Sequence, residues 1–165
     1  MRFLRVAAAT LAAAVVADAR LYRIGIPETI KPGDVFNASV EQLSGIPLQY
    51  TMLWGIERYD DEWSVFPRPG SLGPVMLSVI DLQKTVGDGS VSNNTTIGGL
   101  SVPADYPYYG RAAIQAVIFE IAGPLNSPII ETWWWSVNIT NTTSETLVWA
   151  SYADDNARIC QIPFQ

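Results

Sequence analysis

Residues 35–41 read Val-Phe-Asn-Ala-Ser-Val-Glu, and the type of side chain alternates along this stretch. Phe36, Ala38 and Val40 lie on one side of an extended chain, and the polar Asn37 and Ser39 lie on the other. This period of two residues is typical of a half-buried β-strand, because successive side chains of a strand point to opposite faces. The stretch therefore predicts a strand that presents Asn37 to solvent.

Residues 48–56 and 133–139 show the same alternation. In the second stretch, Trp134 and Asn138 are on the outward face. The inward positions of the two stretches are Leu48, Tyr50, Met52, Trp54, Ile56, Trp133, Trp135, Val137 and Ile139. We expect a buried core that includes Phe36, Val40, Met52, Trp54, Ile118, Trp135 and Val137.

Apolar and β-branched runs between turn residues predict five further strand regions. They are an edge strand over 21–26 stopped by Pro27, a strand over 75–82, one or two strands over 90–102 broken at Gly98-Gly99, a strand over 112–121 that is apolar on both faces, and a last strand over 147–152. Turn signals at 31–34, 67–73, 87–89 and 123–124 separate them.

This pattern predicts an all-β fold, an immunoglobulin-like two-sheet β-sandwich of seven or eight strands, with a small barrel as the alternative. Cys160 is the single cysteine, so an intramolecular disulfide is excluded and packing must supply the stability. We expect Cys160 to be a shielded thiol, with an intermolecular bridge as the alternative.

The N-terminus has the composition of a secretory signal peptide. Arg2 and Arg5 precede an apolar run over 6–16, and Ala17-Asp18-Ala19 matches a cleavage site. The run is too short to span a bilayer. We therefore expect a secreted protein with a signal peptide over 1–19, a sandwich domain over 20–143 and a C-terminal extension over 144–165.

The net charge and the N-glycosylation sequons indicate which partners and which modification to expect. Cleavage removes two arginines and one aspartate, which changes the net charge from −6 to −7. The mature chain holds no cluster of Lys and Arg, which argues against nucleic acid and anionic membranes as partners. We expect a monomer with N-glycosylation at some of five acceptors, which are Asn37, Asn93, Asn94, Asn138 and Asn141.

Few residues are suited to catalysis. The chain contains no histidine, which excludes Ser-His-Asp and Cys-His arrangements and zinc sites built on histidine. The acidic run Asp60-Asp61-Glu62 is expected to be a solvated turn, with a weak calcium site or a glycosidase carboxylate as alternatives. We expect no catalytic residue, cofactor or metal.

Tryptophan supplies the candidate contact residues, because there are six in the chain. Trp54, Trp133 and Trp135 are expected in the core. Trp134, on the outward face, and Trp63, beside the acidic run, are candidates for stacking on a sugar or contacting a protein.

Several motifs occur in an order that resembles the fungal necrosis-inducing secreted protein family of effectors. They are residues 26–38 (Ile-Pro-Glu-Thr-Ile-Lys-Pro-Gly-Asp-Val-Phe-Asn-Ala), Trp54-Gly55, 69–73 (Pro-Gly-Ser-Leu-Gly), 102–104 (Val-Pro-Ala) and 118–123 (Ile-Phe-Glu-Ile-Ala-Gly). The chain departs from the family in its Trp133–Trp135 run, its long 57–68 loop and its residues after Thr143.

The resemblance implies a secreted, non-enzymatic effector of a plant-associated fungus that acts on plant immunity. Some members are described as interfering with immune-receptor-associated kinases and others as provoking cell death. It therefore implies a host plant protein as partner, with such a kinase as one candidate, and leaves open whether the protein enters host cells. Two other functions are weighed against it: a carbohydrate-binding or cell-wall structural module, and a glycoside hydrolase that uses carboxylates alone.

Overall fold

The computed structural model describes residues 21–42, 48–58, 72–82, 84, 95–122, 127–151 and 157–161. The residues of the expected signal peptide lie outside these ranges. Ten strands form in the described part, more than the seven or eight expected. They are β1 (Leu21–Pro27), β2 (Thr29–Ile30), β3 (Val35–Gln42), β4 (Leu48–Arg58), β5 (Val75–Asp81), β6 (Thr95–Ser101), β7 (Gly110–Ala122), β8 (Ser127–Ile139), β9 (Leu147–Ser151) and β10 (Ala157–Gln161).

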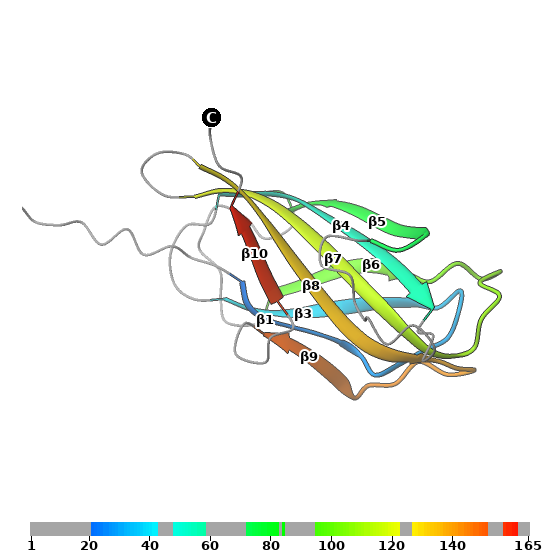
Figure 1. Cartoon of the computed structure of the whole chain (residues 1–165). Coiled ribbons are helices and arrows are strands. Elements are labelled where there is room, and N and C mark those ends of the chain that lie inside the picture. The colour runs from blue at the N-terminus through cyan, green and yellow to red at the C-terminus, as the bar shows by residue number, and fades with distance from the viewer. Residues whose placement is uncertain are drawn as a thin grey trace, which may run out of the picture.

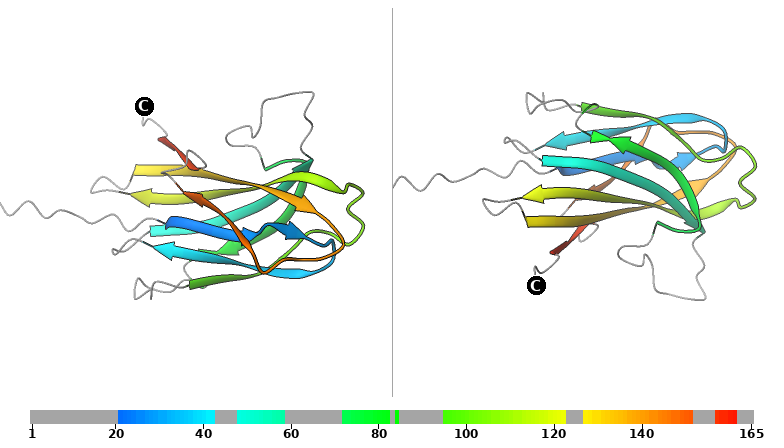
Figure 2. Two further views of the ribbon diagram at one scale, coloured as in Figure 1. Left: turned by 90° about the horizontal axis from the view of Figure 1, so that it is seen from below. Right: turned by 90° about the horizontal axis from the view of Figure 1, so that it is seen from above.

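The strands form two sheets, which lie one above the other in Figure 1. One sheet has four strands in the order β6-β3-β1-β9. The other has six, in the order β10-β8-β7-β4-β5 with the short β2 parallel to the end of β8. Figure 2 shows the four-stranded sheet from below and the six-stranded sheet from above. No helix of the described residues has the length and apolar character that a membrane span requires.

Side chains from both sheets fill the space between them, and all seven of the predicted core residues are buried. Trp54 of β4 and Trp135 of β8 stack with their ring centroids 5.1 Å apart and their planes at 18°. The Trp135 Nε1–H donates to the carbonyl oxygen of Ile24 in the opposite sheet, at 2.9 Å. Strand β7, which the sequence predicted as apolar on both faces, lies between β4 and β8 and is buried on both faces over 112–116.

Strand β1 corrects one expectation, because it is an inner strand and not an edge. It pairs with β3 on one side and with β9 on the other. Pro27 ends β1 opposite Leu147 of β9, beyond the residues that pair with β3. The missing amide of a proline is tolerated at such a position. Residues of the expected C-terminal extension thus supply the second neighbour of β1 through β9, and another neighbour of β8 through β10.

The predicted turn at 31–34 is present and joins β2 to β3. Asp34 N donates to Lys31 O at 3.1 Å, and Gly33 has a φ of 87°. Proline followed by a residue with positive φ is the signature of a type II turn. Gly33 N also donates to Val102 O at 2.9 Å, which ties this turn to the chain after β6.

The glycine pair in β6 does not break the strand as expected. β6 pairs with β3 through Phe36 opposite Leu100 and Ala38 opposite Ile97, so β6 has one extra residue between these pairs. Gly99 has a φ of 78° there. A glycine with positive φ lets a strand accommodate a β-bulge without ending, and Gly98-Gly99 serves this purpose.

Candidate partner-binding surface

The predicted contact residue Trp134 lies on the outer face of the six-stranded sheet and is half-buried. It pairs with Gln115 of β7, which pairs with Gly55 of β4 and through it with Met76 of β5. Gln115 Nε2 donates to Glu57 Oε2 at 3.3 Å. Trp134 therefore belongs to a row of paired positions that crosses four strands and that has no side chain at Gly55.

A second, apolar row lies beside it. Val79 of β5 is opposite Leu53 of β4, which is opposite Val117 of β7. None of the three belongs to the core cluster, and Val79 is 59% exposed. Phe119, the next outward residue of β7, is 38% exposed, and Met76 in the first row is 59% exposed. We call Trp134, Met76, Val79, Leu53, Val117 and Phe119 the outer apolar surface.

Sequence reasoning identified Trp134 in this surface and missed the other members. An outward valine or leucine has the same alternation as an inward one, so composition alone does not distinguish the faces. The available signal was the apolar character of both faces of 112–121.

The chain before β5 folds back onto this face. A Cβ at Gly55 would overlap the carbonyl oxygen of Leu72. At Gly73, which has a φ of 73°, an added Cβ would lie 2.8 Å from Glu57 Cβ. Leu72-Gly73, the described part of the 69–73 motif, therefore touches β4 at Gly55–Glu57, and only glycine at position 55 admits the Leu72 backbone.

Two other motifs also meet. Besides the hydrogen bond from Gly33 to Val102, an added Cβ at Gly33 would lie 3.2 Å from Ala104 Cβ. The 31–34 turn and the 102–104 segment are thus packed together. These motif residues hold the fold in shape, since each contact joins parts of the chain that are distant in sequence.

The predicted glycan acceptors in the described part are accessible. Asn37 is exposed on the four-stranded sheet, Asn138 on the six-stranded sheet and Asn141 in the turn that follows β8. Thr143, the hydroxyl residue of the Asn141 sequon, donates to Asp34 Oδ2 at 2.9 Å and accepts from Lys31 N at 3.0 Å. Asn93, Asn94, Trp63 and the acidic run Asp60-Asp61-Glu62 lie outside the described residues. The same holds for the side chain of Cys160.

Two glutamates lie inside the molecule, which the sequence analysis did not anticipate. Glu131 is fully buried and Glu120 is 3% exposed. They are on the same face as Trp133 and Ile118, and Trp133 Nε1–H donates to Glu131 Oε2 at 3.3 Å. A glycosidase needs its two carboxyls on either side of a sugar in an open site. Burial among core side chains does not provide one at this pair.

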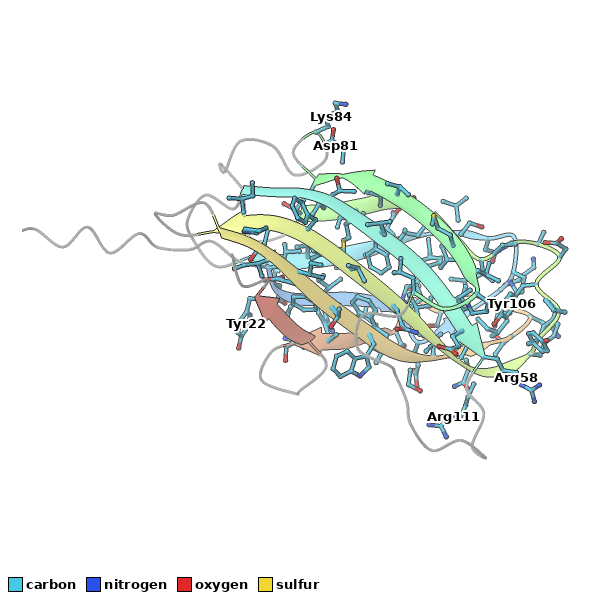
Figure 3. All side chains as sticks on the ribbon, turned by 45° about the horizontal axis from the view of Figure 1, so that its top comes forward. Tyr22, Arg58, Asp81, Lys84, Tyr106 and Arg111 are labelled. Carbon is cyan, nitrogen blue, oxygen red and sulfur yellow. The ribbon has the colours of Figure 1, made fainter. Side chains whose placement is uncertain are left out.

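Tyrosines gather at the end of the molecule where β4 finishes and β7 begins. Tyr106 and Tyr108 meet edge to face, with centroids 5.7 Å apart and planes at 76°. The Arg58 guanidinium lies over the Tyr108 ring, with Cζ 5.2 Å from the centroid. Figure 3 shows Arg58 and Tyr106 together at this end. Burial is the main cause that raises the pKa of Tyr106. The neighbouring Tyr108 and Glu57 raise this pKa further, whereas Arg58 lowers it.

The described residues contain no cluster of three or more His, Cys, Asp and Glu side chains that could hold a metal ion. Their arrangement is that of an all-β protein with an apolar surface on one sheet. The sequence model of the Nis1 family matches residues 17–139, which is most of the chain. The protein belongs to the Nis1 family, which confirms the resemblance drawn from its motifs.

A relative supports the same assignment. The chain is 26% identical over 168 aligned residues to a protein of Colletotrichum orbiculare named "Necrosis-inducing secreted protein 1". The alignment covers 97% of this chain and 95% of the relative. The two proteins are thus similar over nearly their whole lengths.

Proposed function

We propose that this protein is a secreted fungal effector that acts by binding a host plant protein, without catalysis. The outer apolar surface carries the proposal, because exposed apolar side chains gathered on one face are typical of protein contact sites. The name of the Colletotrichum relative and the expected signal peptide support secretion. Immune-receptor-associated kinases are the candidate partners, and modulation of plant immunity or cell death is the outcome we infer.

We also propose that the sandwich is immunoglobulin-like. Such a sandwich has seven main strands, and it places the third, sixth and seventh together in one sheet and the first, second and fifth in the other. If the two-residue β2 is left out of the count, β4, β7 and β8 are the third, sixth and seventh strands, and β1, β3 and β6 are the first, second and fifth. The orders β4-β7-β8 and β6-β3-β1 give these neighbours. β9 and β10 then extend the two sheets at their ends.

The described tryptophans give less support to a carbohydrate-binding module. Stacking on a polysaccharide needs aromatic rings aligned on one face. Trp134 lies on the six-stranded sheet, whereas Trp149 lies on the four-stranded sheet and packs flat against Gly25. Trp54, Trp133 and Trp135 are buried. These five rings do not form a row.

Expression in plant cells without residues 1–19 tests the proposal. We expect the protein to reduce the oxidative burst that follows an immune elicitor, and the double substitution Trp63→Ala and Trp134→Ala to abolish this effect. A second variant, Met76→Ser with Val79→Ser, addresses the described surface directly. Val35→Ser is the matched control, because Val35 is 70% exposed on the other sheet.

The thermal unfolding of each variant is measured alongside, so that loss of the fold is separated from loss of contact. Normal suppression by both double variants would show that the surface is wrong. Cleavage of chitin, glucan or cellulose by the purified wild-type protein would refute a function without catalysis.

A further inference from the structure

The segment between β6 and β7 holds three tyrosines within four residues, Tyr106, Tyr108 and Tyr109. Tyr106 is 6% exposed and anchors the segment, whereas Tyr108 is 45% and Tyr109 is 65% exposed. We call residues 103–109 the tyrosine loop. Exposed tyrosines are common in binding sites, because a large ring with a hydroxyl group gives much contact area for few rotatable bonds.

The tyrosine loop is fixed at several points. Tyr106 N donates to Pro103 O at 3.0 Å, and the Tyr106 ring meets the Tyr108 ring edge to face. Ala104 packs on the 31–34 turn at Gly33. Pro103 and Pro107 restrict the backbone further. Because the loop is held in the free protein, little conformational entropy is lost when a partner binds.

Arg58 provides the charge beside these rings. It is exposed at the end of β4, and its guanidinium lies over Tyr108. No carboxylate of the described ranges lies within salt-bridge distance of Arg58, and the neighbouring Glu57 accepts a hydrogen bond from Gln115 instead. A guanidinium in contact with an aromatic ring keeps its donors available for a carboxylate, which it can bind through two parallel hydrogen bonds.

We propose that Arg58, Tyr108 and Tyr109 form a contact site for an acidic protein segment. A partner carboxylate binds the Arg58 guanidinium, and apolar or aromatic side chains beside it pack on the two tyrosine rings. This inference rests on the proposed function and specifies the chemistry of the partner. The mature chain is acidic overall, which opposes the approach of such a segment, so its attraction depends on the short-range contact with Arg58.

A protein segment fits this site better than an acidic polysaccharide. Tyr106 is buried and its ring meets the Tyr108 ring at 76°, so Tyr106 does not extend the exposed Tyr108 ring into a plane on which successive sugar rings could stack. Asp105 is exposed in the same loop and opposes an acidic partner. Its removal should therefore strengthen binding, whereas removal of Arg58 should weaken it.

Binding of the secreted mature protein to two polycarboxylates tests the proposal. The protein probe is a random copolymer of glutamate and tyrosine, and the sugar probe is polygalacturonate. In salt of about 0.15 M we expect binding to the copolymer, weakened about tenfold by Arg58→Gln or Tyr109→Ala, as for residues at the centre of an interface. Asp105→Asn should tighten it. Lys84→Gln is the control, because Lys84 has an 85% exposed side chain and pairs with Asp81 at 3.0 Å.

Each contrary outcome is distinct. Absence of copolymer binding, equal binding by Arg58→Gln, or tighter binding to polygalacturonate would overturn the proposal. Because the assay uses no plant immune readout, these results leave the proposed effector function intact. If the wild-type protein does not suppress immunity in the plant assay but does bind the copolymer, the result would count against the effector function alone.

Discussion

The indole nitrogen of Trp135 donates a hydrogen bond of 2.9 Å to the carbonyl oxygen of Ile24, and this bond joins the two sheets through the core. The same indole stacks on Trp54. One side chain thus fixes the distance between the sheets and the position of its neighbour. In a chain without a disulfide, such contacts determine how the sheets are aligned.

Substitution of Trp135 by phenylalanine should lower the free energy of unfolding by about 1–3 kcal/mol, because the buried carbonyl of Ile24 loses this donor. Urea denaturation followed by circular dichroism measures the change. Trp134→Phe is the control on the same strand, since Trp134 faces outward. Equal effects of the two substitutions would show that the cross-sheet hydrogen bond is not important for stability.

Substitution of Gly55 by alanine should destabilise the protein by about 1–3 kcal/mol or more, because the Leu72 backbone must move away from the new Cβ. The thermal unfolding midpoint measures this change. Gly98→Ala is a suitable comparison, since an added Cβ there meets only the Asn37 side-chain oxygen, at 3.2 Å, and that side chain can turn. If Gly55→Ala is as stable as Gly98→Ala, Leu72 does not lie over Gly55.

Alkaline pH should destabilise the fold through Tyr106. Its pKa in the folded protein lies above the usual 10.0, chiefly because of burial. The phenol of Tyr106 therefore releases its proton at a lower pH in the unfolded chain than in the folded protein. The resulting contribution to the free energy of unfolding is fully present below pH 10 and is lost as the pH rises through the folded pKa. Tyr106→Phe should flatten the fall in stability above pH 10, as shown by unfolding midpoints across pH. An unchanged slope would contradict the prediction.

Thr143 should contribute to stability independently of glycosylation. Asn141→Gln and Thr143→Ala both abolish the same sequon. Only the second removes the hydroxyl between Asp34 and the Lys31 amide, which should lower the free energy of unfolding by about 1–2 kcal/mol. Chemical denaturation after N-glycosidase treatment separates the two effects. Equal stability of the variants would mean that the hydroxyl has no structural role.

Secretion from a fungal host should yield a chain that begins near Arg20. N-terminal sequencing of the protein from the medium checks this, and a start at Met1 would exclude the predicted cleavage. N-glycosidase treatment of the same material should increase its mobility in gels, because Asn37 and Asn138 are exposed. An unchanged mobility would show that the sequons are unoccupied.

Alternation in the sequence was sufficient to predict the faces of the main strands. Phe36, Ala38 and Val40 are buried and Asn37 is exposed, as the alternation predicted. These assignments require only that one face of a single strand lies against the core. The inner position of β1 could not be predicted in this way, since it depends on pairing with β9, more than a hundred residues later. Local patterns contain no information about such distant pairing.

The candidate surface was predictable in part. Trp134 was identified because a tryptophan out of phase with Trp133 and Trp135 has to face outward. The row of Val79, Leu53 and Val117 requires the register of three strands, which becomes known only when the sheet is assembled. Likewise, Arg58 and Tyr108 are fifty positions apart, and no spacing rule relates them.

The pairing of β8 has a consequence for aggregation. β8 is a long strand with three consecutive tryptophans, and a free edge on such a strand would be a template for another chain. β10 covers this edge at Ile129–Trp133, and β2 covers it at Asn138–Ile139. Two short segments, one near each end of the chain, thus cover two stretches of this edge, which reduces the backbone that β8 offers for pairing with another chain.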